Sequence, residues 1–290
     1  IGNGEREKTT EKLKRKQKLA IALAVFIVFV GAVLGGLQLG VVWADASWEH
    51  WYPDYEKQDI SAILQKDELT DADYDLLYAQ TGLTKLGIDG LLEEGNIRQI
   101  LNIQDFYFEE HTVNCERFNP YTYSEKLEEG SVPLAKLEDG DIIVTATTHV
   151  SVWRLGHAAL VVDGDSNRLL EAFGPGDVSE LTYASTFTGL ADLMVLRPKF
   201  PEEFRAEVAA YARENMQGAK YSFWAGIFHK KYSDTFEYTQ CAHVAWYAYK
   251  HFGVDLDSNG GLVVTPPEIA NSPYVEVVQI FGFDPDKLWG

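Results

Sequence analysis

Two residues of types that could form a nucleophile and its base lie at the starts of regular elements. His157 opens the apolar stretch 157–162, which predicts a β-strand, and Cys241 opens the stretch 241–251, which predicts an amphipathic helix. A thiol becomes a strong nucleophile when its thiolate is stabilised, and an imidazole within reach can take its proton. The sequence therefore predicts Cys241 as a nucleophile and His157 as its base.

The local sequence around Cys241 predicts an environment that favours a thiolate. Thr239 has a side chain typical of an N-cap, which would place Cys241 in the first turn of the helix. Backbone amide groups without intrahelical partners and the positive end of the helix dipole stabilise an anion there. An alternative stays open for each residue: Cys241 could be an unreactive core thiol on the apolar face that Val244 and Ala245 form, and His157 could be a structural histidine.

Glu171 is predicted to orient the imidazole of His157. The sequence predicts two strands, 155–162 and 168–173, joined by a three-residue loop over 164–166. The register that this loop sets puts Glu171 and His157 on one face as diagonal neighbours, about 7 to 8 Å apart at the backbone. A carboxylate in that position would orient the ring and stabilise its protonated form.

Tyr221 is a candidate substrate-binding residue. Together with the backbone amide of Cys241, its hydroxyl could donate to an oxyanion formed on the substrate. The alternative is that Tyr221 packs among the aromatic side chains that follow it, Phe223, Trp224 and Phe228.

Six features of the sequence occur in a particular order. They are a Gly-Asp-Ile-Ile strand entry at 140–143, a His before an apolar strand at 157, a Glu-Ala pair at 171–172, a strand ending in Leu-Arg at 196–197, a Gly-x-x-Tyr step at 218–221 and a Cys on a helix at 241. On these residues the chain resembles the circularly permuted branch of the NlpC-type papain-like superfamily, specifically the YiiX/YycO-like relatives of cell-wall-associated hydrolases. The resemblance covers about 136 to 250. Papain-type hydrolases usually place the cysteine before the histidine, so the reversed order fits a permuted fold.

The resemblance implies a permuted papain-like domain with an antiparallel sheet and a nucleophile-bearing helix. It also implies Cys241 as nucleophile, His157 as base and then acid, and Glu171 as the polar third member. Two positions depart from the family pattern: Ala-His follows Cys241 where many relatives have Ser-Glu, and Ser follows Tyr221 where Asp is familiar. We therefore do not carry a substrate preference over from the family.

The first 44 residues predict a membrane-targeting segment. Residues 1–18 hold seven Lys or Arg against three Glu, whereas residues 19–44 hold no charged side chain. An apolar stretch of this length can cross a bilayer, and its basic flank predicts that residues 1–18 stay in the cytoplasm. The segment 19–44 is either a transmembrane anchor or a signal peptide, because Ala44-Asp45-Ala46 has the small-x-small form that signal peptidase favours. Either way, the remainder of the chain is expected to be extracytoplasmic.

Two regions follow the apolar segment. Residues 45–135 predict a helical N-terminal region, with helices at 69–78, 88–92 and 97–108. Residues 136–290 predict the catalytic domain, in which short strands alternate with turn signals and helices flank them. The predicted fold class is therefore α+β.

Composition and motif content exclude several function classes. The net charge of −19 repels phosphate backbones, so nucleic acid is not an expected partner. Two cysteines, Cys115 and Cys241, exclude a four-cysteine zinc site but leave one disulfide between them open. No metal-binding, nucleotide-binding or Gly-x-Ser-x-Gly motif occurs, and we expect neither a metal nor a cofactor. His149 and Arg154 precede the predicted histidine strand and could line a cleft, but they are interpreted as residues of a solvated loop.

The sequence predicts an exported, membrane-tethered cysteine hydrolase of the amidase or peptidase type. Its expected partners are a peptide or isopeptide amide of the bacterial cell envelope and the membrane itself, through residues 19–44. The catalytic domain would lie outside the cytoplasm at the cell membrane, or be secreted if the signal is cleaved. Two alternatives stay open, a thiol-dependent acyltransferase acting on lipid or amine substrates and a non-catalytic peptide-binding module of the same fold.

Overall fold

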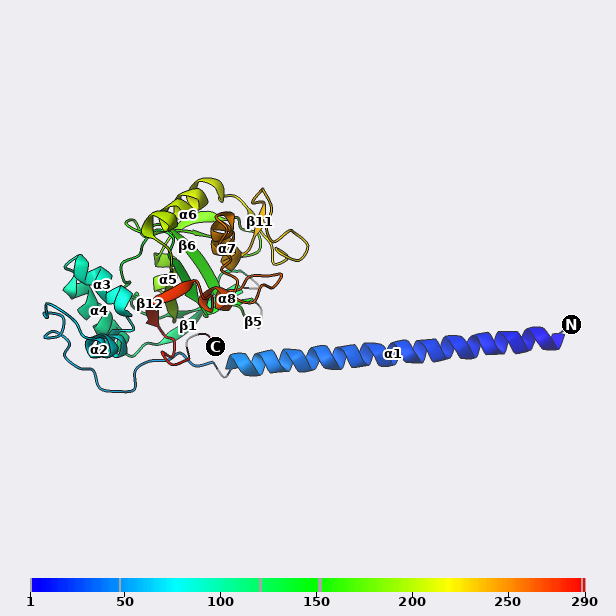
Figure 1. Ribbon diagram of the computed structural model, residues 1–290. Coiled ribbons are helices and arrows are strands. Elements are labelled where there is room, and N and C mark those ends of the chain that lie inside the picture. Colours follow the sequence, from blue (N-terminus) through cyan, green and yellow to red (C-terminus); the bar gives the residue numbers. More distant parts are fainter. Residues whose placement is uncertain (1, 47, 120–121, 151–152, 288, 290) are drawn as a thin grey trace. The chain divides into compact units, whose positions relative to one another are not determined.

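The chain folds as two compact units. The computed structural model describes residues 2–46, 48–119, 122–150, 153–287 and 289. The division falls between Ile1–Trp48 and Glu49–Gly290, and the two units are described separately here (Figure 1).

The first unit contains one long helix, α1 (Gly2–Ala46). Within it, Lys16–Gly40 spans 25 residues with a mean hydropathy of 2.7, and none of this stretch is buried inside the protein. At about 1.5 Å per residue, such a helix exceeds the roughly 30 Å of a bilayer's hydrocarbon core. The helix is therefore long and apolar enough to cross a membrane, a property that it shares with signal sequences.

The second unit is built on an antiparallel sheet of six strands, and its fold is mixed α and β, as the sequence predicts. In spatial order the strands are β12 (Val275–Phe281), β9 (Leu193–Pro198), β3 (Ile142–Thr145), β6 (His157–Asp163), β7 (Arg168–Glu171) and β8 (Glu180–Tyr183). Residues 157–162 of β6 are all buried, because both faces of the central strands are covered.

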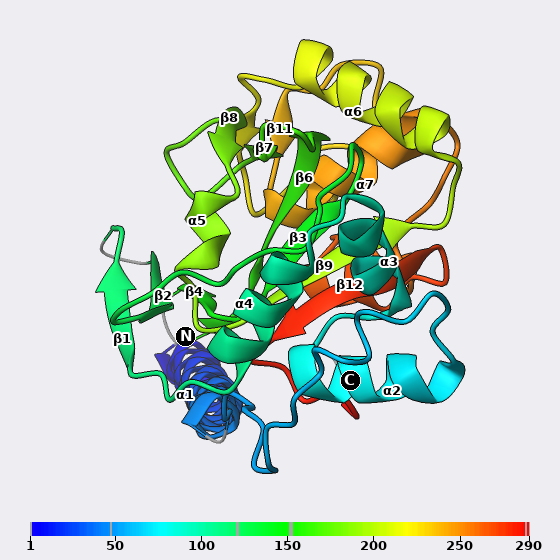
Figure 2. The same ribbon diagram turned by 90° about the vertical axis from the view of Figure 1, so that its left-hand side faces the viewer.

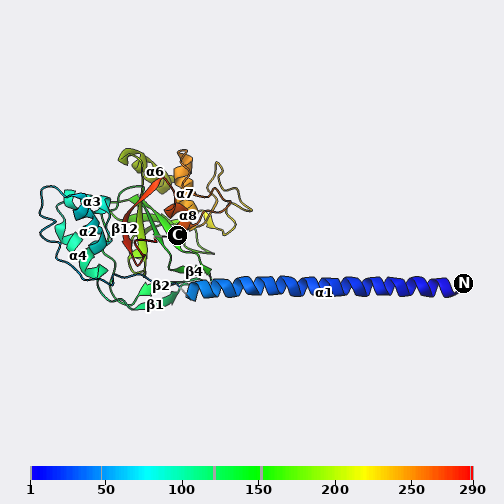
Figure 3. The ribbon, with the colours of Figure 1, turned by 60° about the horizontal axis from the view of Figure 1, so that its bottom comes forward.

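Helices cover the two faces of this sheet. The helices α6 (Glu202–Asn215) and α7 (Cys241–His251) pack against β6 on one face. The other face carries α2 (Asp71–Thr81), α3 (Lys85–Glu93) and α4 (Ile97–Tyr107). In Figure 2, α3 and α4 lie in front of the sheet and α2 lies below β12, and α3 packs against β12. Figure 3 shows the same two helical groups on opposite sides of β12.

The three N-terminal helices belong to the same core as the sheet. A capping box between Thr70 and Asp73 begins α2, and Gly82 ends it in the left-handed region, with φ of 70°. A Cβ at Gly82 would lie 2.3 Å from the carbonyl oxygen of Ile280, so only glycine allows this approach to β12. The Ile280 amide in turn donates to the Gly82 carbonyl at 2.9 Å. The predicted helical region is therefore a structural part of the second unit.

The prediction of a helical region over 45–135 is wrong for residues 113–117 and 122–127. These residues form β1 (Val113–Arg117) and β2 (Thr122–Leu127), which pair in a second sheet with β4 (Thr148–Val150) and β5 (Trp153–Arg154). In β2 the first and third residues are buried and the second is not, which is the period of a strand and not of a helix. The remaining elements are short: α5 (Ser185–Thr188), β10 (Lys220–Tyr221), β11 (Tyr238–Thr239) and α8 (Pro266–Ala270).

A buried ion pair fixes the start of β3 against β9. The guanidinium of Arg197 donates to both carboxylate oxygens of Asp141, with N to O distances of 2.9 and 2.8 Å. The preceding residue, Gly140, has φ of 84°, and a Cβ there would lie 2.6 Å from the Tyr249 hydroxyl and 2.8 Å from the Cβ of Arg205. Because Tyr249 belongs to α7 and Arg205 to α6, the Gly140-Asp141 pair sets the positions of both helices on the sheet.

A second group of buried charges holds the segment that follows α1. Glu125 of β2 accepts hydrogen bonds from both terminal nitrogens of Arg154, at 2.9 and 2.7 Å, and lies 3.1 Å from His149 Nε2. His50 Nε2 lies 2.8 Å from Glu125, and His50 Nδ1 lies 3.4 Å from Asp192. The interpretation of His149 and Arg154 as a solvated loop is therefore wrong, because the second sheet buries both around one carboxylate.

The charge on His50 is expected to make stability depend on pH. Burial alone would lower the pKa of His50, but the Asp192 and Glu125 carboxylates outweigh it and raise that pKa to about 9. Because the pKa is higher in the folded state, protonated His50 stabilises the fold. This contribution is fully present below the pKa of the unfolded chain, about 6.5, and is lost as the pH rises through the pKa of the folded state. Between about pH 6 and pH 9.5, the wild type should lose on the order of 2 kcal/mol more unfolding free energy than His50→Gln.

Urea unfolding of the full-length protein in detergent micelles, followed by near-ultraviolet circular dichroism, measures this difference. Titration of the groups outside this cluster, including His157, is shared by the two proteins and cancels in the comparison. Parallel stability profiles for wild type and His50→Gln would contradict the assignment of a charged His50.

Candidate active site

The starts of β6 and α7 and the end of β7 bring the predicted site residues together. His157 is the first residue of β6, Cys241 is the first residue of α7 and Glu171 is the last residue of β7. Gly156 precedes His157 with φ of 71°, and a Cβ there would lie 2.5 Å from the carbonyl oxygen of Thr145. The turn into β6 thus requires glycine and directs the chain so that His157 starts the strand.

The predicted register between β6 and β7 is confirmed, whereas the predicted loop is wrong. Leu160 pairs with Leu170 and Val161 with Leu169, which is the register that makes Glu171 a diagonal neighbour of His157. Asp163 pairs with Arg168, however, because a register shift occurs after Val161. The connection is therefore a four-residue turn over 164–167, and a β-bulge absorbs the extra residue.

His157 and Glu171 form a buried hydrogen-bonded pair. His157 Nε2 lies 2.6 Å from Glu171 Oε2, and each side chain is 3% exposed. The Thr182 hydroxyl donates to the other carboxylate oxygen at 2.6 Å. The ring of His157 stacks on Phe187 at 5.3 Å and meets Phe173 edge-on at 5.1 Å, and these two contacts restrict its orientation. Although burial raises the pKa of Glu171, its hydrogen bond and charge interaction with His157 lower that pKa overall.

The second nitrogen of the His157 ring is available to Cys241. Burial alone would lower the pKa of His157, but a hydrogen bond with Cys241 and the interactions with Glu171 raise it to about 10. Because Glu171 occupies Nε2, the nitrogen left for the sulfur is Nδ1. The arrangement therefore keeps a proton on the imidazole at neutral pH and places a positive charge beside the sulfur.

Cys241 lies at the start of its helix, but Thr239 is not the N-cap. Gln240 occupies that position with φ of −137°, and Thr239 belongs to β11 instead. Cys241 is 7% exposed, and its sulfur lies 3.5 Å from the amide oxygen of Gln240. Cys115 is an exposed residue of β1, and no disulfide joins it to Cys241. The disulfide left open by the sequence is therefore excluded, and Cys241 keeps a thiol in the first helical turn.

A cavity of about 250 Å³ gives access to this thiol, and most of its lining is apolar. The residues around it come from the second sheet, from β6, from 221–223 and from 263–266. Tyr221 is among them, since β10 pairs in parallel with β11 and places Tyr221 beside Thr239. The pKa of Tyr221 is raised by burial first and by the charge of Cys241 second, so its hydroxyl keeps its proton and can donate.

Gln240 is a site residue that the sequence analysis missed. It is buried, it lines the cavity, its amide oxygen approaches the Cys241 sulfur and its amide nitrogen donates to the Val264 carbonyl oxygen. Its place directly before Cys241 is the signal that the sequence offers, but Thr, Ser, Asp and Asn are so common at N-caps that the pattern favours Thr239.

His243 has a structural role outside the cavity. Its Nδ1 lies 3.0 Å from the Thr239 hydroxyl, and its Nε2 lies 2.7 Å from the Lys231 carbonyl oxygen. Burial lowers the pKa of His243 to about 4, so this ring is neutral and holds the 229–233 segment against α7.

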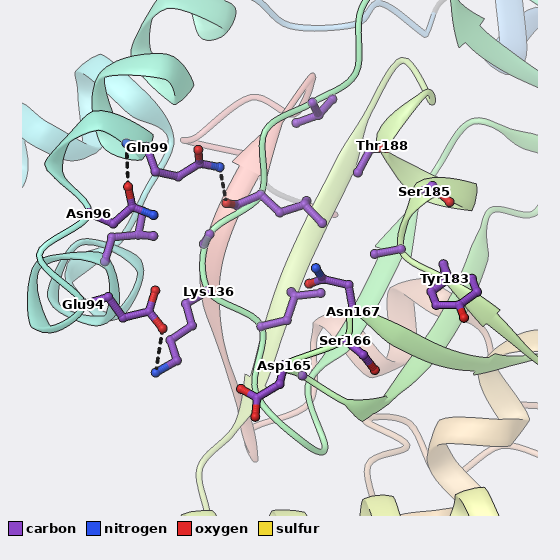
Figure 4. A pocket seen from close by; sticks show the side chains of 17 residues that line it. Glu94, Asn96, Gln99, Lys136, Asp165, Ser166, Asn167, Tyr183, Ser185 and Thr188 are labelled. Carbon is purple, nitrogen blue, oxygen red and sulfur yellow. Dashed lines mark hydrogen bonds and ion pairs between the residues drawn. The ribbon is translucent and has the colours of Figure 1, made fainter.

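A larger hollow of about 640 Å³ lies between α3, α4, the segment 132–137 and the turn after β6. Figure 4 shows its polar side chains, among them Glu94 in an ion pair with Lys136. The residues that line it include no His or Cys. Within the described part of the chain, no group of three or more His, Cys, Asp or Glu could hold a metal ion.

Comparison with protein-family models, with curated proteins and with solved structures found no match.

The charge of Glu171 should be measurable in the titration of His157. Glu171→Gln keeps an acceptor of similar size but removes the negative charge, so the pKa of His157 should fall from about 10 by at least about one unit. The nitrogen-15 shifts of the His157 imidazole, followed against pH in labelled protein, give this value directly.

Glu180→Gln is the matched control, because Glu180 pairs with Glu171 across β7 and β8 but is exposed. The control should leave the His157 titration unchanged. An unchanged His157 titration in Glu171→Gln would show that Glu171 does not set the charge of the ring.

Proposed function

We propose that the protein is a cysteine hydrolase of the amidase or peptidase type, with Cys241 as nucleophile, His157 as base and acid, and Glu171 as the residue that orients the imidazole. The observation that carries this proposal is the buried chain of contacts from Glu171 through His157 to Cys241 at the wall of a cavity. What distinguishes this ring from the structural His243 is its buried carboxylate partner, Glu171, and its place with Cys241 at the wall of one cavity.

The proposed reaction transfers an acyl group to water. The Cys241 sulfur attacks the amide carbonyl carbon, and the C–N bond breaks as protonated His157 donates its proton to the departing nitrogen. His157 then removes a proton from water, which attacks the thioester and releases the acid and the Cys241 thiol. The Cys241 amide, at the first helical position, has no intrahelical acceptor and is the candidate oxyanion donor, with the Tyr221 hydroxyl as a second one.

The order of elements supports a permuted papain-like fold for this domain. The histidine strand, the carboxylate strand and the cysteine helix follow one another along the chain and meet at one end of an antiparallel sheet. In the proposal, α1 exports the domain and tethers it as an anchor, or is removed as a signal, and the substrate is a peptide or isopeptide amide of the bacterial cell envelope.

A second candidate is thiol-dependent acyl transfer to a lipid or an amine. The lining of the cavity favours it, because side chains such as Leu155, Phe173, Phe223 and Val263 offer few polar groups to a peptide. An apolar acyl chain would bury its surface against these side chains, and the thioester on Cys241 would then pass to an acceptor other than water.

Cys241→Ala should abolish turnover, with a loss of at least about 1,000-fold, because it removes the atom that forms the thioester. The measurement is release of amine from peptidoglycan fragments and from a panel of acyl-amine compounds by the full-length protein. Cys115→Ser is the matched control, because it removes the other thiol from an exposed strand, and it should keep wild-type turnover.

The products separate the candidates. Free acid supports hydrolysis, whereas a thioester that passes to an added amine or lipid without net hydrolysis supports transfer. Equal turnover by Cys241→Ala would remove the nucleophile assignment. Alkylation of Cys241 by iodoacetamide no faster than a model thiol at about pH 6.5 would favour the peptide-binding module.

A further inference from the structure

Two loops beside the cavity expose large apolar side chains. Trp224, Ile227 and Phe228 of the first loop and Leu262 of the second have exposed fractions of 54%, 45%, 76% and 68%. We call these four residues the lip. Water-exposed side chains of this size, gathered in one place, mark an interaction surface more often than isolated ones do.

The two loops are in close contact, so the lip is one surface. Gly226 has φ of 94°, and a Cβ there would lie 1.7 Å from the carbonyl oxygen of Leu262. Trp224 precedes this glycine in the chain and Phe228 follows it, and their ring centroids lie 5.0 Å apart. The backbone of the first loop thus rests on the second, and the four side chains are presented together.

The lip lies beside the mouth of the cavity. Phe223 and Val263 line the cavity that reaches Cys241, while their chain neighbours Trp224 and Leu262 are exposed. In each loop, therefore, one residue lines the cavity and its chain neighbour is exposed to solvent. A surface that contacted the lip would lie directly at the entrance to the Cys241 thiol.

The first loop of the lip is basic, unlike the chain as a whole. The whole chain holds 44 acidic and 25 basic residues, yet residues 215–233 contain Lys220, Lys230 and Lys231 and no Asp or Glu. The ammonium of Lys231 is bound by Asp257, whereas Lys220 and Lys230 are exposed. Aromatic and aliphatic side chains flanked by lysines fit a lipid surface that carries anionic headgroups.

We propose that the lip docks onto a lipid bilayer and holds the cavity mouth at the membrane surface. The occupant is taken to be a membrane because α1 is long and apolar enough to cross one, a property of anchors and of signal sequences. Trp and Phe side chains at the boundary between headgroups and acyl chains bury apolar area without a protein partner. The proposal rests on the proposed function only for its consequence, that substrates enter from the membrane surface, because docking itself needs no catalysis.

Photo-crosslinking of the full-length protein in nanodiscs that contain anionic lipid tests the docking. Benzoylphenylalanine replaces Phe228 in one protein and Trp224 in a second, so that a local effect of either replacement does not decide the result. Tyr183 is the matched control position, since it is an aromatic residue with the same exposed fraction as Trp224, 54%, and lines the hollow of Figure 4. Mass spectrometry should find at least about tenfold more lipid adducts at 228 and 224 than at 183.

Equal adduct yields at the lip and at position 183 would overturn the proposal, and so would covalent dimers of the chain in place of lipid adducts. The same measurement in a Cys241→Ala background should give unchanged lipid adducts, because no chemical step is involved. If the lip gives no excess of lipid adducts but the unsubstituted full-length protein still turns over substrate, the docking proposal fails and the enzyme proposal stands. Lipid adducts at the lip without turnover would instead remove the enzyme assignment and leave the docking surface.

Discussion

The hydrogen bond between His157 and Glu171 is the interaction on which the site depends, because neither side chain reaches water. Burial disfavours both charges, so each group is stable in its charged form only while the other stays in place. Thr182 satisfies the second carboxylate oxygen, and Phe187 covers the ring. Through these two contacts, β8 and α5 stabilise the charged pair of His157 and Glu171 as well as completing the core.

The position of the sulfur depends on a different set of contacts. Cys241 is placed by α7, and the far end of α7 is fixed by the Tyr249 hydroxyl, which donates to the Gly140 carbonyl oxygen at 2.8 Å. The next residue, Asp141, is bound by Arg197 from β9. The sequence features that mark the resemblance thus divide into two kinds. In the proposed function His157, Glu171 and Cys241 carry the chemistry, whereas the Gly-Asp and Leu-Arg pairs hold the sheet and the helices in place.

The sequence predicts those parts of the structure that depend on local pattern. Alternating and apolar runs locate β6, β7 and α7, and the register of the first two follows from side-chain faces, since a slip by one residue would turn Glu171 away from His157. Thr122 and Ser124 show where prediction fails. Both are buried, with the half-buried Tyr123 between them, because β2 pairs with β4. That partner strand lies more than twenty residues away, and no local pattern reveals the pairing. The predictions of the turn after β6 and of the N-cap of α7 fail for a related reason. The residue types present there fit more than one turn or cap.

The histidines show why residue type alone does not identify a charged group. Burial lowers the pKa of His157 and of His243 alike, yet the first ends at about 10 and the second at about 4. The difference lies in the partners: a carboxylate faces His157, whereas His243 meets a carbonyl oxygen, a hydroxyl and the unfavourable charge of Lys231. Although His243 is only two residues from Cys241, it cannot serve as the positive partner of a thiolate. In the proposed function the base therefore comes from the sheet, where the Glu171 carboxylate stabilises the proton on the His157 ring. His157 and Cys241, 84 positions apart in the chain, line the same cavity.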